Sequence, residues 1–168
     1  MPPYNYVGPE RIKNEVRGQA PGVAVTSVAG ILQWLKGSER SPGIGAEITA
    51  TFVVDLGGHL RLADRRSEHV ACAGGQPVLS AGEITFMLED DGVRVTSVTN
   101  QSTGYCPAPS SWTHVGEALR RIGVEDPGGF TTEFIFRRCP ACRELNLVKD
   151  AWFVCALCEA DLPPTWNV

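Results

Sequence analysis

The stretch AEITATFVVDLGGHLRLA, residues 46–63, decides the fold of this chain. Apolar residues alternate with other residues from Ile48 to Leu56, and this period is typical of a strand that is buried mainly on one face. Gly57-Gly58 predicts a hairpin turn, and residues 59–63 return as the partner strand. The sequence therefore places an antiparallel hairpin at the centre of the protein.

Further strands are expected on the C-terminal side of this hairpin. Residues 82–88 and 93–99 flank the turn Glu89-Asp90-Asp91-Gly92, whose Asp-Gly end is typical of a hairpin turn. A last strand is expected at residues 130–136, from the alternation of Phe130, Thr132, Phe134 and Phe136.

Helices are expected at residues 9–17, 27–36 and 111–122, because each segment has apolar residues at helical spacing and a glycine directly after it. The predicted fold class is α+β: an antiparallel sheet with about three helices over residues 1–129, and a metal-binding unit over residues 130–168. Because the strand at 130–136 leads directly into the first cysteine of this unit, we expect the unit to be continuous with the body.

Four cysteines form the most specific motif in the chain. They stand as Cys139-Pro140-Ala141-Cys142 and Cys155-Ala156-Leu157-Cys158, with twelve residues between the pairs. A two-residue gap lets one tight turn direct both sulfurs at a common point, so the two pairs predict a tetrahedral metal site. Zinc is the expected ion, with iron as the alternative, and a closed site of four thiolates leaves no open position for chemistry.

The segment from Phe134 to Leu162 resembles the zinc-ribbon or rubredoxin-like knuckle fold. The resemblance implies that all four cysteines are metal ligands and that residues 145–148 and 152–154 form two strands around a turn at Lys149-Asp150. Many such knuckles have a glycine after the second cysteine of each pair, whereas this chain has Arg143 and Glu159 there.

A second resemblance lies in the middle of the chain. The strand Ala81-Gly82-Glu83 and the turn with Asn100, Ser102, Tyr105 and Pro107 resemble a segment of uncharacterised bacterial proteins, in which the turn often reads Asn-x-Ser-Gly-His-Tyr-x-Pro. Thr103-Gly104 stands where that segment has Gly-His, so its histidine is missing here. No activity is implied by this resemblance.

The same region contains the side chains best suited to catalysis. An enzyme would use His69 as acid or base, Glu83 as its partner or as a catalytic carboxylate, and Tyr105 or Cys106 near the substrate. This hypothesis places His69 on a strand at 68–72 and expects His69, Glu83 and Tyr105 to share one concave surface. The alternative is that these are hydrogen-bonded or buried residues without a catalytic role.

The same region offers residues for two further sites. A second metal site would combine His69 and Cys72, which have suitable local spacing, with Cys106 and His114. The arginines of 61–66 would form an anion site, although Asp64 and Glu68 lie among them and favour a solvated face instead.

Charge and composition limit the classes of partner. The chain has 168 residues and a net charge of −4, and four thiolates on one zinc ion would add about two negative charges. This balance argues against nucleic-acid binding, which would require a basic surface formed by Arg120, Arg121, Arg137 and Arg138. No signal peptide or membrane span is expected, so we expect a reducing cytoplasm and a protein partner rather than nucleic acid or membrane.

The leading hypothesis is therefore an intracellular zinc-binding protein that acts as a protein-interaction or adaptor module. The alternatives are a small enzyme or ligand-binding protein with a site around His69, Glu83 and Tyr105, and nucleic-acid binding through the ribbon.

Overall fold

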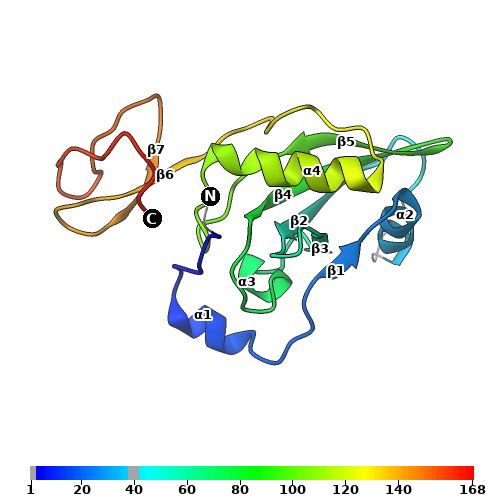
Figure 1. Cartoon of the computed structure of the whole chain (residues 1–168), viewed down its shortest axis with the longest axis horizontal. Coiled ribbons are helices and arrows are strands. Elements are labelled where there is room, and N and C mark those ends of the chain that lie inside the picture. The colour runs from blue at the N-terminus through cyan, green and yellow to red at the C-terminus, as the bar shows by residue number, and fades with distance from the viewer. Residues whose placement is uncertain (1–2, 38–41) are drawn as a thin grey trace.

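A five-stranded antiparallel sheet forms the centre of the computed structural model, which describes residues 3–37 and 42–168. Its strand order is β1-β3-β2-β4-β5. A separate two-stranded sheet, β6 with β7, forms a ribbon that extends from one end of the body (Figure 1). The strands are β1 (Val23–Val25), β2 (Glu47–Val54), β3 (Leu60–Asp64), β4 (Ser80–Glu89), β5 (Gly92–Val98), β6 (Ile135–Arg138) and β7 (Leu145–Val148).

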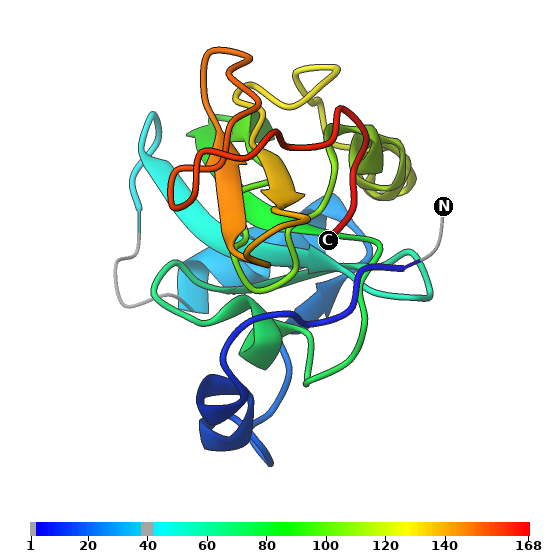
Figure 2. The same cartoon turned by 90° about the vertical axis from the view of Figure 1, so that its left-hand side faces the viewer.

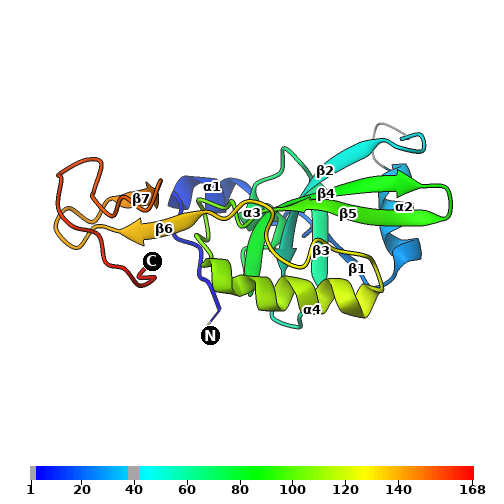
Figure 3. The ribbon, with the colours of Figure 1, turned by 90° about the horizontal axis from the view of Figure 1, so that it is seen from above.

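The helices cover both faces of the large sheet. The longer helices α2 and α4 pack on one face, and the short helices α1 and α3 lie on the other (Figure 3). Their bounds are α1 (Glu10–Glu15), α2 (Val28–Gly37), α3 (His69–Cys72) and α4 (Trp112–Ile122), with a 3-10 turn η1 (Pro109–Ser111) before α4. The predicted α+β class with an antiparallel sheet is confirmed.

The central strand β2 is buried on both faces of the sheet. Phe52 and Val54 belong to the core beneath α2 and α4, whereas Val53 belongs to the second core beside α3. The expectation that this strand is buried mainly on one face is therefore wrong for its second half. The sequence pattern predicts burial of one face only, because threonines occupy the other face at the start of the strand.

Local end signals explain the two long helices. The Ser27 hydroxyl accepts a hydrogen bond from the backbone N–H of Gly30 at 3.1 Å, which caps the first turn of α2. Helix α4 ends at Gly123, whose φ of +83° is the left-handed conformation that glycine tolerates best. Ser111 does not cap α4 with its side chain, because its hydroxyl is paired with that of Ser80 at 2.9 Å.

Three expected strands are wrong in whole or in part. Residues 69–72 form the helical turn α3 instead of a strand. Of residues 130–136 only the end enters β6, because Thr131 binds the edge of β5 at Val98 instead of joining a ladder. In the ribbon, β7 pairs with β6, whereas residues 152–154 contribute only the isolated bridge of Val154 with Asp161.

The C-terminal tail ties the ribbon to the body. Trp166 donates its indole N–H to the carbonyl of Cys106 at 2.8 Å and packs edge-on against Tyr4 with ring centroids 5.2 Å apart. The buried guanidinium of Arg137 donates to the carbonyls of Phe136, Pro163 and Pro164. Figure 2 shows the tail passing in front of the body beside the ribbon. The aromatic residues near the two ends of the chain thus pack together on the body. The division at residue 129 stays a prediction.

Candidate metal centre

The two cysteine pairs form turns with the same backbone geometry. In the first turn, Cys139 N–H donates to Glu144 at 2.8 Å and Arg143 N–H donates to Cys139 at 3.0 Å. In the second turn, Cys155 N–H donates to Ala160 at 2.8 Å and Glu159 N–H donates to Cys155 at 3.0 Å. Strand β6 leads directly into the first turn, because Cys139 follows the last residue of β6.

Arg143 and Glu159 adopt the conformation that a glycine would adopt at these positions. Their φ angles are +67° and +62°, in the left-handed region that residues with a Cβ rarely enter. The missing glycines therefore leave the shape of the turns unchanged, and the two charged residues carry the backbone strain instead.

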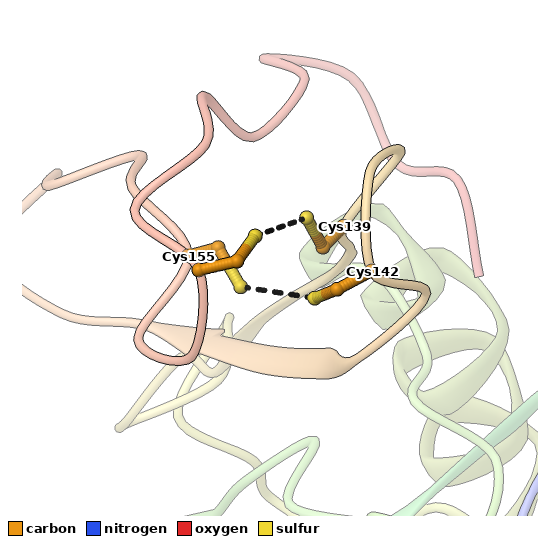
Figure 4. A group of neighbouring side chains, drawn as sticks. Cys139, Cys142 and Cys155 are labelled. Atoms are coloured by element: carbon orange, nitrogen blue, oxygen red, sulfur yellow. Dashed lines mark hydrogen bonds between the residues drawn. The ribbon is translucent and has the colours of Figure 1, made fainter.

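The four sulfurs lie close enough together to hold one metal ion. The ligand atoms of Cys139, Cys142, Cys155 and Cys158 are all within 4.8 Å of one another. Across the turns, Sγ of Cys139 is 3.6 Å from Sγ of Cys158, and Sγ of Cys142 is 3.6 Å from Sγ of Cys155 (Figure 4). A zinc ion with four Zn–S bonds of about 2.3 Å requires an edge of about 3.8 Å between sulfurs, so the residues present fit a tetrahedral zinc site.

Hydrogen-bond donors favour the thiolate forms of Cys139 and Cys155, whereas the pKa of Cys142 is raised to about 12, because the lowering effect of the backbone N–H of Glu144 is outweighed by burial and the neighbouring thiols. The backbone N–H of Cys142 is the main cause that lowers the pKa of Cys139, and the backbone N–H of Cys158 is the main cause that lowers the pKa of Cys155 to about 6. All six cysteines are free thiols, so the pairs are not closed by disulfides.

Asn146 contacts the cysteine cluster through its side-chain amide, and the sequence analysis does not predict this role. Its amide N–H donates to Sγ of Cys155 at 3.4 Å, and its carbonyl oxygen accepts from the backbone N–H of Ala156 at 2.9 Å. The available signal was a polar residue within the apolar run Leu145-Asn146-Leu147-Val148 of β7. A buried asparagine there orients the second cysteine turn.

The alternative of a second metal site from His69, Cys72, Cys106 and His114 is not supported by the described residues. Among the described residues, the four ribbon cysteines are the only group of three or more potential ligands that gathers in this way. His69 instead places Nε2 3.0 Å from the carbonyl of Gly82, and the Cys72 thiol points at the carbonyl of Arg61.

His69 and Glu83 lie on the face of the sheet that carries α1 and α3. Burial lowers the pKa of His69, and its hydrogen bond with Gly82 and the charge of Glu83 only partly oppose that shift. The carboxylate of Glu83 is half-buried and lies 3.6 Å from the guanidinium of Arg65. The structure therefore brings these two candidates near each other, with Glu83 engaged by an arginine.

Tyr105 and Cys106 lie in the interior of the protein. The Tyr105 side chain is fully buried in the second core and donates its hydroxyl to the carbonyl of Gln76 at 2.7 Å. Burial raises the pKa of the Cys106 thiol to about 12, so this cysteine is protonated at neutral pH. Tyr105 and Cys106 are thus buried, whereas Glu83 is partly exposed, and the catalytic roles of the four candidates stay predictions.

Asn100 explains the turn that resembles the bacterial segment. Its amide N–H group donates to the carbonyls of Pro107 at 2.8 Å and Phe134 at 2.7 Å, and its carbonyl accepts from the N–H of Phe134 at 2.7 Å. The buried amide therefore joins the turn to the segment that leads into β6, which is a structural role.

The arginines proposed for nucleic-acid binding have different surroundings. Arg137 is buried against backbone carbonyls, and Arg121 is paired with Glu117 at 2.9 Å. Arg138 donates to the carbonyl of Arg143 at 3.1 Å, and Arg120 is exposed on α4. Two of the four are thus used within the fold of the ribbon.

Comparison with known proteins gives no match: none of the family models, curated proteins or solved structures that were searched is similar to this chain. Within the described residues, no helix has the length and apolar character that crossing a membrane demands.

Proposed function

We propose that this protein is an intracellular zinc-binding module that docks a protein partner on its C-terminal ribbon. The observation that carries the proposal is a hollow of about 730 Å³ on the ribbon, lined by Leu147 and Trp152 together with Val154, Cys155 and Ala156. We call it the ribbon hollow. Trp152 is 71% exposed, and the neighbouring Leu157 is 68% exposed.

The zinc has a structural role in this proposal. A site closed by four thiolates has no free position for a substrate, so bound zinc supplies folding energy to the ribbon. Cys155 is both a sulfur of the cluster and a wall of the ribbon hollow. Zinc therefore fixes the shape of the surface that the partner contacts. A reducing cytoplasm keeps these thiols available to zinc.

A partner with an apolar anchor flanked by basic residues fits this surface best. Exposed tryptophan is enriched at the centres of protein interfaces, where it fills or forms an apolar pocket. The charged residues that line the hollow are Lys149, Asp150 and Glu159, and the four-thiolate zinc centre adds about two negative charges. This negative balance complements a basic protein segment and repels phosphates.

Trp152→Ala tests the proposal, because it removes the exposed anchor without touching a cysteine. Ile44→Ala is the matched control, since Ile44 is also 71% exposed but lies outside the ribbon. Proteins retained by the immobilised wild-type chain are purified and titrated against all three forms, with zinc content measured by native mass spectrometry. We expect one zinc per chain in each form, and binding to Trp152→Ala that is weaker by at least about tenfold, which corresponds to about 1.4 kcal/mol.

Two results would contradict the proposal. One is a purified partner that binds Trp152→Ala as tightly as the wild type, because the ribbon hollow is then not the docking surface. The other is a folded protein without zinc, because the four cysteines then have no structural metal.

A further inference from the structure

A second cavity lies at the opposite end of the molecule from the ribbon, where α2 passes the edge of the large sheet (Figure 3). It has a volume of about 800 Å³, which is within the usual range of ligand pockets. We call it the edge groove. The residues that matter for its chemistry are Val23, Trp34, Ile48, Thr49, Asp64 and Arg66.

The pairing register leaves part of β2 without a neighbour at this groove. Strand β4 pairs with β2 over its whole length, from Glu47 to Val54. Strand β3 pairs with β2 only from Ala50 to Val54. The first three residues of β2 therefore have a strand on one side only, and a free strand edge is a template for another strand.

The backbone groups on this free edge can be assigned from the ladder. Ala46 accepts from Leu88 N–H and Val54 accepts from Leu79 N–H, so even-numbered residues of β2 direct their groups at β4. Glu47 and Thr49 consequently direct their backbone N–H and C=O groups to the open side of β2. Within residues 3–37 and 42–168, no backbone hydrogen bond joins the N–H or C=O of Glu47, or the N–H of Thr49, to another segment on that side.

Side chains next to the free edge differ between its two faces. Ile48 points to the face that carries α2, where Trp34 and Val23 complete an apolar lining. On the opposite face, Arg65 lies beside Glu83 on the neighbouring strand, with its own side chain 64% exposed. A strand added here would thus meet an apolar pocket on one face and the Arg65–Glu83 ion pair on the other.

The charged side chains that line the groove are Arg65, Arg66 and Asp64, which together carry a net charge of +1. Arg65 is paired with Glu83 at 3.6 Å, and no ion pair within the described part of the chain involves Arg66, so Arg66 is the cation left for an acidic ligand. Two carboxylates near the free edge make hydrogen bonds to neutral donors. Asp64 accepts the backbone N–H of Arg66 at 2.9 Å, and Glu47 accepts the hydroxyl of Thr96 at 3.0 Å.

From these observations we propose that the edge groove binds an extended peptide with alternating apolar and acidic side chains, which adds to the sheet beside Glu47–Thr49. The peptide backbone bonds to the free groups of Glu47 and Thr49. Its apolar side chains enter the pocket at Trp34, and an acidic side chain meets the unpaired Arg66. This site is separate from the ribbon hollow.

A fluorescein-labelled peptide of sequence Gly-Glu-Val-Glu-Val-Glu-Gly is the probe, and fluorescence anisotropy against the full chain is the measurement. We expect saturable binding that weakens at high salt. The same peptide with alternate backbone amides N-methylated should bind at least about tenfold more weakly, because methylation removes the donors of the added strand. A peptide with Lys in place of Glu should not bind.

Two variants test the protein side. Thr49→Pro blocks the free edge but leaves the ladder with β4, because the N–H of Thr49 faces the open side, where proline is tolerated. Arg66→Glu reverses the charge of the unpaired arginine, and Arg17→Glu is its control on an exposed site outside the groove. We expect at least about tenfold weaker binding for Thr49→Pro and Arg66→Glu only. Circular dichroism and zinc content establish that both fold.

Three outcomes would overturn the inference. They are no saturable binding of the probe, equal binding of the N-methylated probe, and equal binding by folded Thr49→Pro. Equal binding of the methylated probe would mean that the groove takes side chains or small anions without adding a strand. Trp152→Ala should bind the probe normally, so the two proposals fail or succeed independently.

Discussion

Arg143 and Glu159 each adopt a backbone conformation that a residue with a side chain disfavours. Each follows the second cysteine of its pair, and each donates its N–H to the first cysteine from a left-handed backbone. Left-handed backbone costs a residue with a Cβ roughly 1 kcal/mol or more relative to glycine. The turns keep this geometry because the hydrogen bonds on both sides of each cysteine pair fix it.

Replacing these residues by glycine should therefore stabilise the zinc-loaded protein. We expect Arg143→Gly and Glu159→Gly each to raise the free energy of unfolding by about 0.5–1 kcal/mol, since the relief of strain exceeds the entropy that glycine adds to the unfolded chain. Urea unfolding measures the change. Arg143→Ala and Glu159→Ala are the controls, and their expected effect is near zero. Destabilisation by glycine would show that the side chains contribute more than the strain costs.

At the scale of the element, strand β4 holds its place because Gly82 has no side chain. A Cβ on Gly82 would lie 1.9 Å from the carbonyl oxygen of Thr99, at the point where the chain leaves β5. Thr99 N–H donates to Glu83 at 2.9 Å, so this close approach is part of the pairing of the two strands. The carbonyl of Gly82 also faces His69 at 3.0 Å.

Gly82→Ala should accordingly be severely destabilising. The methyl group can be accommodated only if the end of β5 moves, and we expect a loss of about 3 kcal/mol or failure to fold. Gly92→Ala is the matched control in the same strand pair, because a Cβ there has no atom within 4 Å. We expect that control to change the free energy of unfolding by less than about 1 kcal/mol. Similar effects of the two substitutions in thermal unfolding would contradict this account of β4.

The parts of the fold that were predictable from sequence are those fixed by neighbouring residues. The hairpin of β2 and β3 is predictable because its period and its Gly57-Gly58 turn are local, and the cysteine spacing predicts the cluster of four sulfurs for the same reason. Strand β1 has only three residues, too few for a period, so it was missed. Residues 69–72 form a helical turn where the sequence predicts a strand, because four residues cannot distinguish a strand from one helical turn.

Features that depend on distant contacts were not predictable. The ribbon pairing of β6 with β7, and the burial of Tyr105 beneath the N-terminal segment, are set by how remote elements meet. The same holds for the edge groove, which exists because β3 stops short of the start of β2. No residue in either strand signals that difference in length.

At the scale of the whole molecule, the metal centre and the tail form one unit. Arg137 precedes the cysteine turn by two residues and binds the carbonyls of Pro163 and Pro164, and Trp166 then reaches Cys106 and Tyr4. The large sheet has its own cores on both faces, and these cores do not include the four cysteines of the ribbon. Loss of the metal should therefore loosen the ribbon and tail before the sheet.

Hydrogen exchange with and without a zinc chelator tests this order. After chelation we expect faster exchange by at least about tenfold in residues 135–168, a smaller increase around Tyr4, and little change in β2 and β4. Cys139→Ser should reproduce the chelated pattern. Cys106→Ser should not, because serine can keep the hydrogen bond to the carbonyl of Thr103. Uniform acceleration across the sheet would contradict a separate ribbon-and-tail unit.

The contact of Tyr4 with Trp166 can form only late during synthesis of the chain. These rings are 5.2 Å apart in the folded protein, yet the ribosome makes one before the sheet and the other after it. The segment around Tyr4 can pair early with Val78, through the bridge between these two residues. The segment around Tyr4 lacks its contact with Trp166 until the tail is synthesised. A nascent chain stalled before Trp166 should therefore present an uncovered aromatic surface to chaperones.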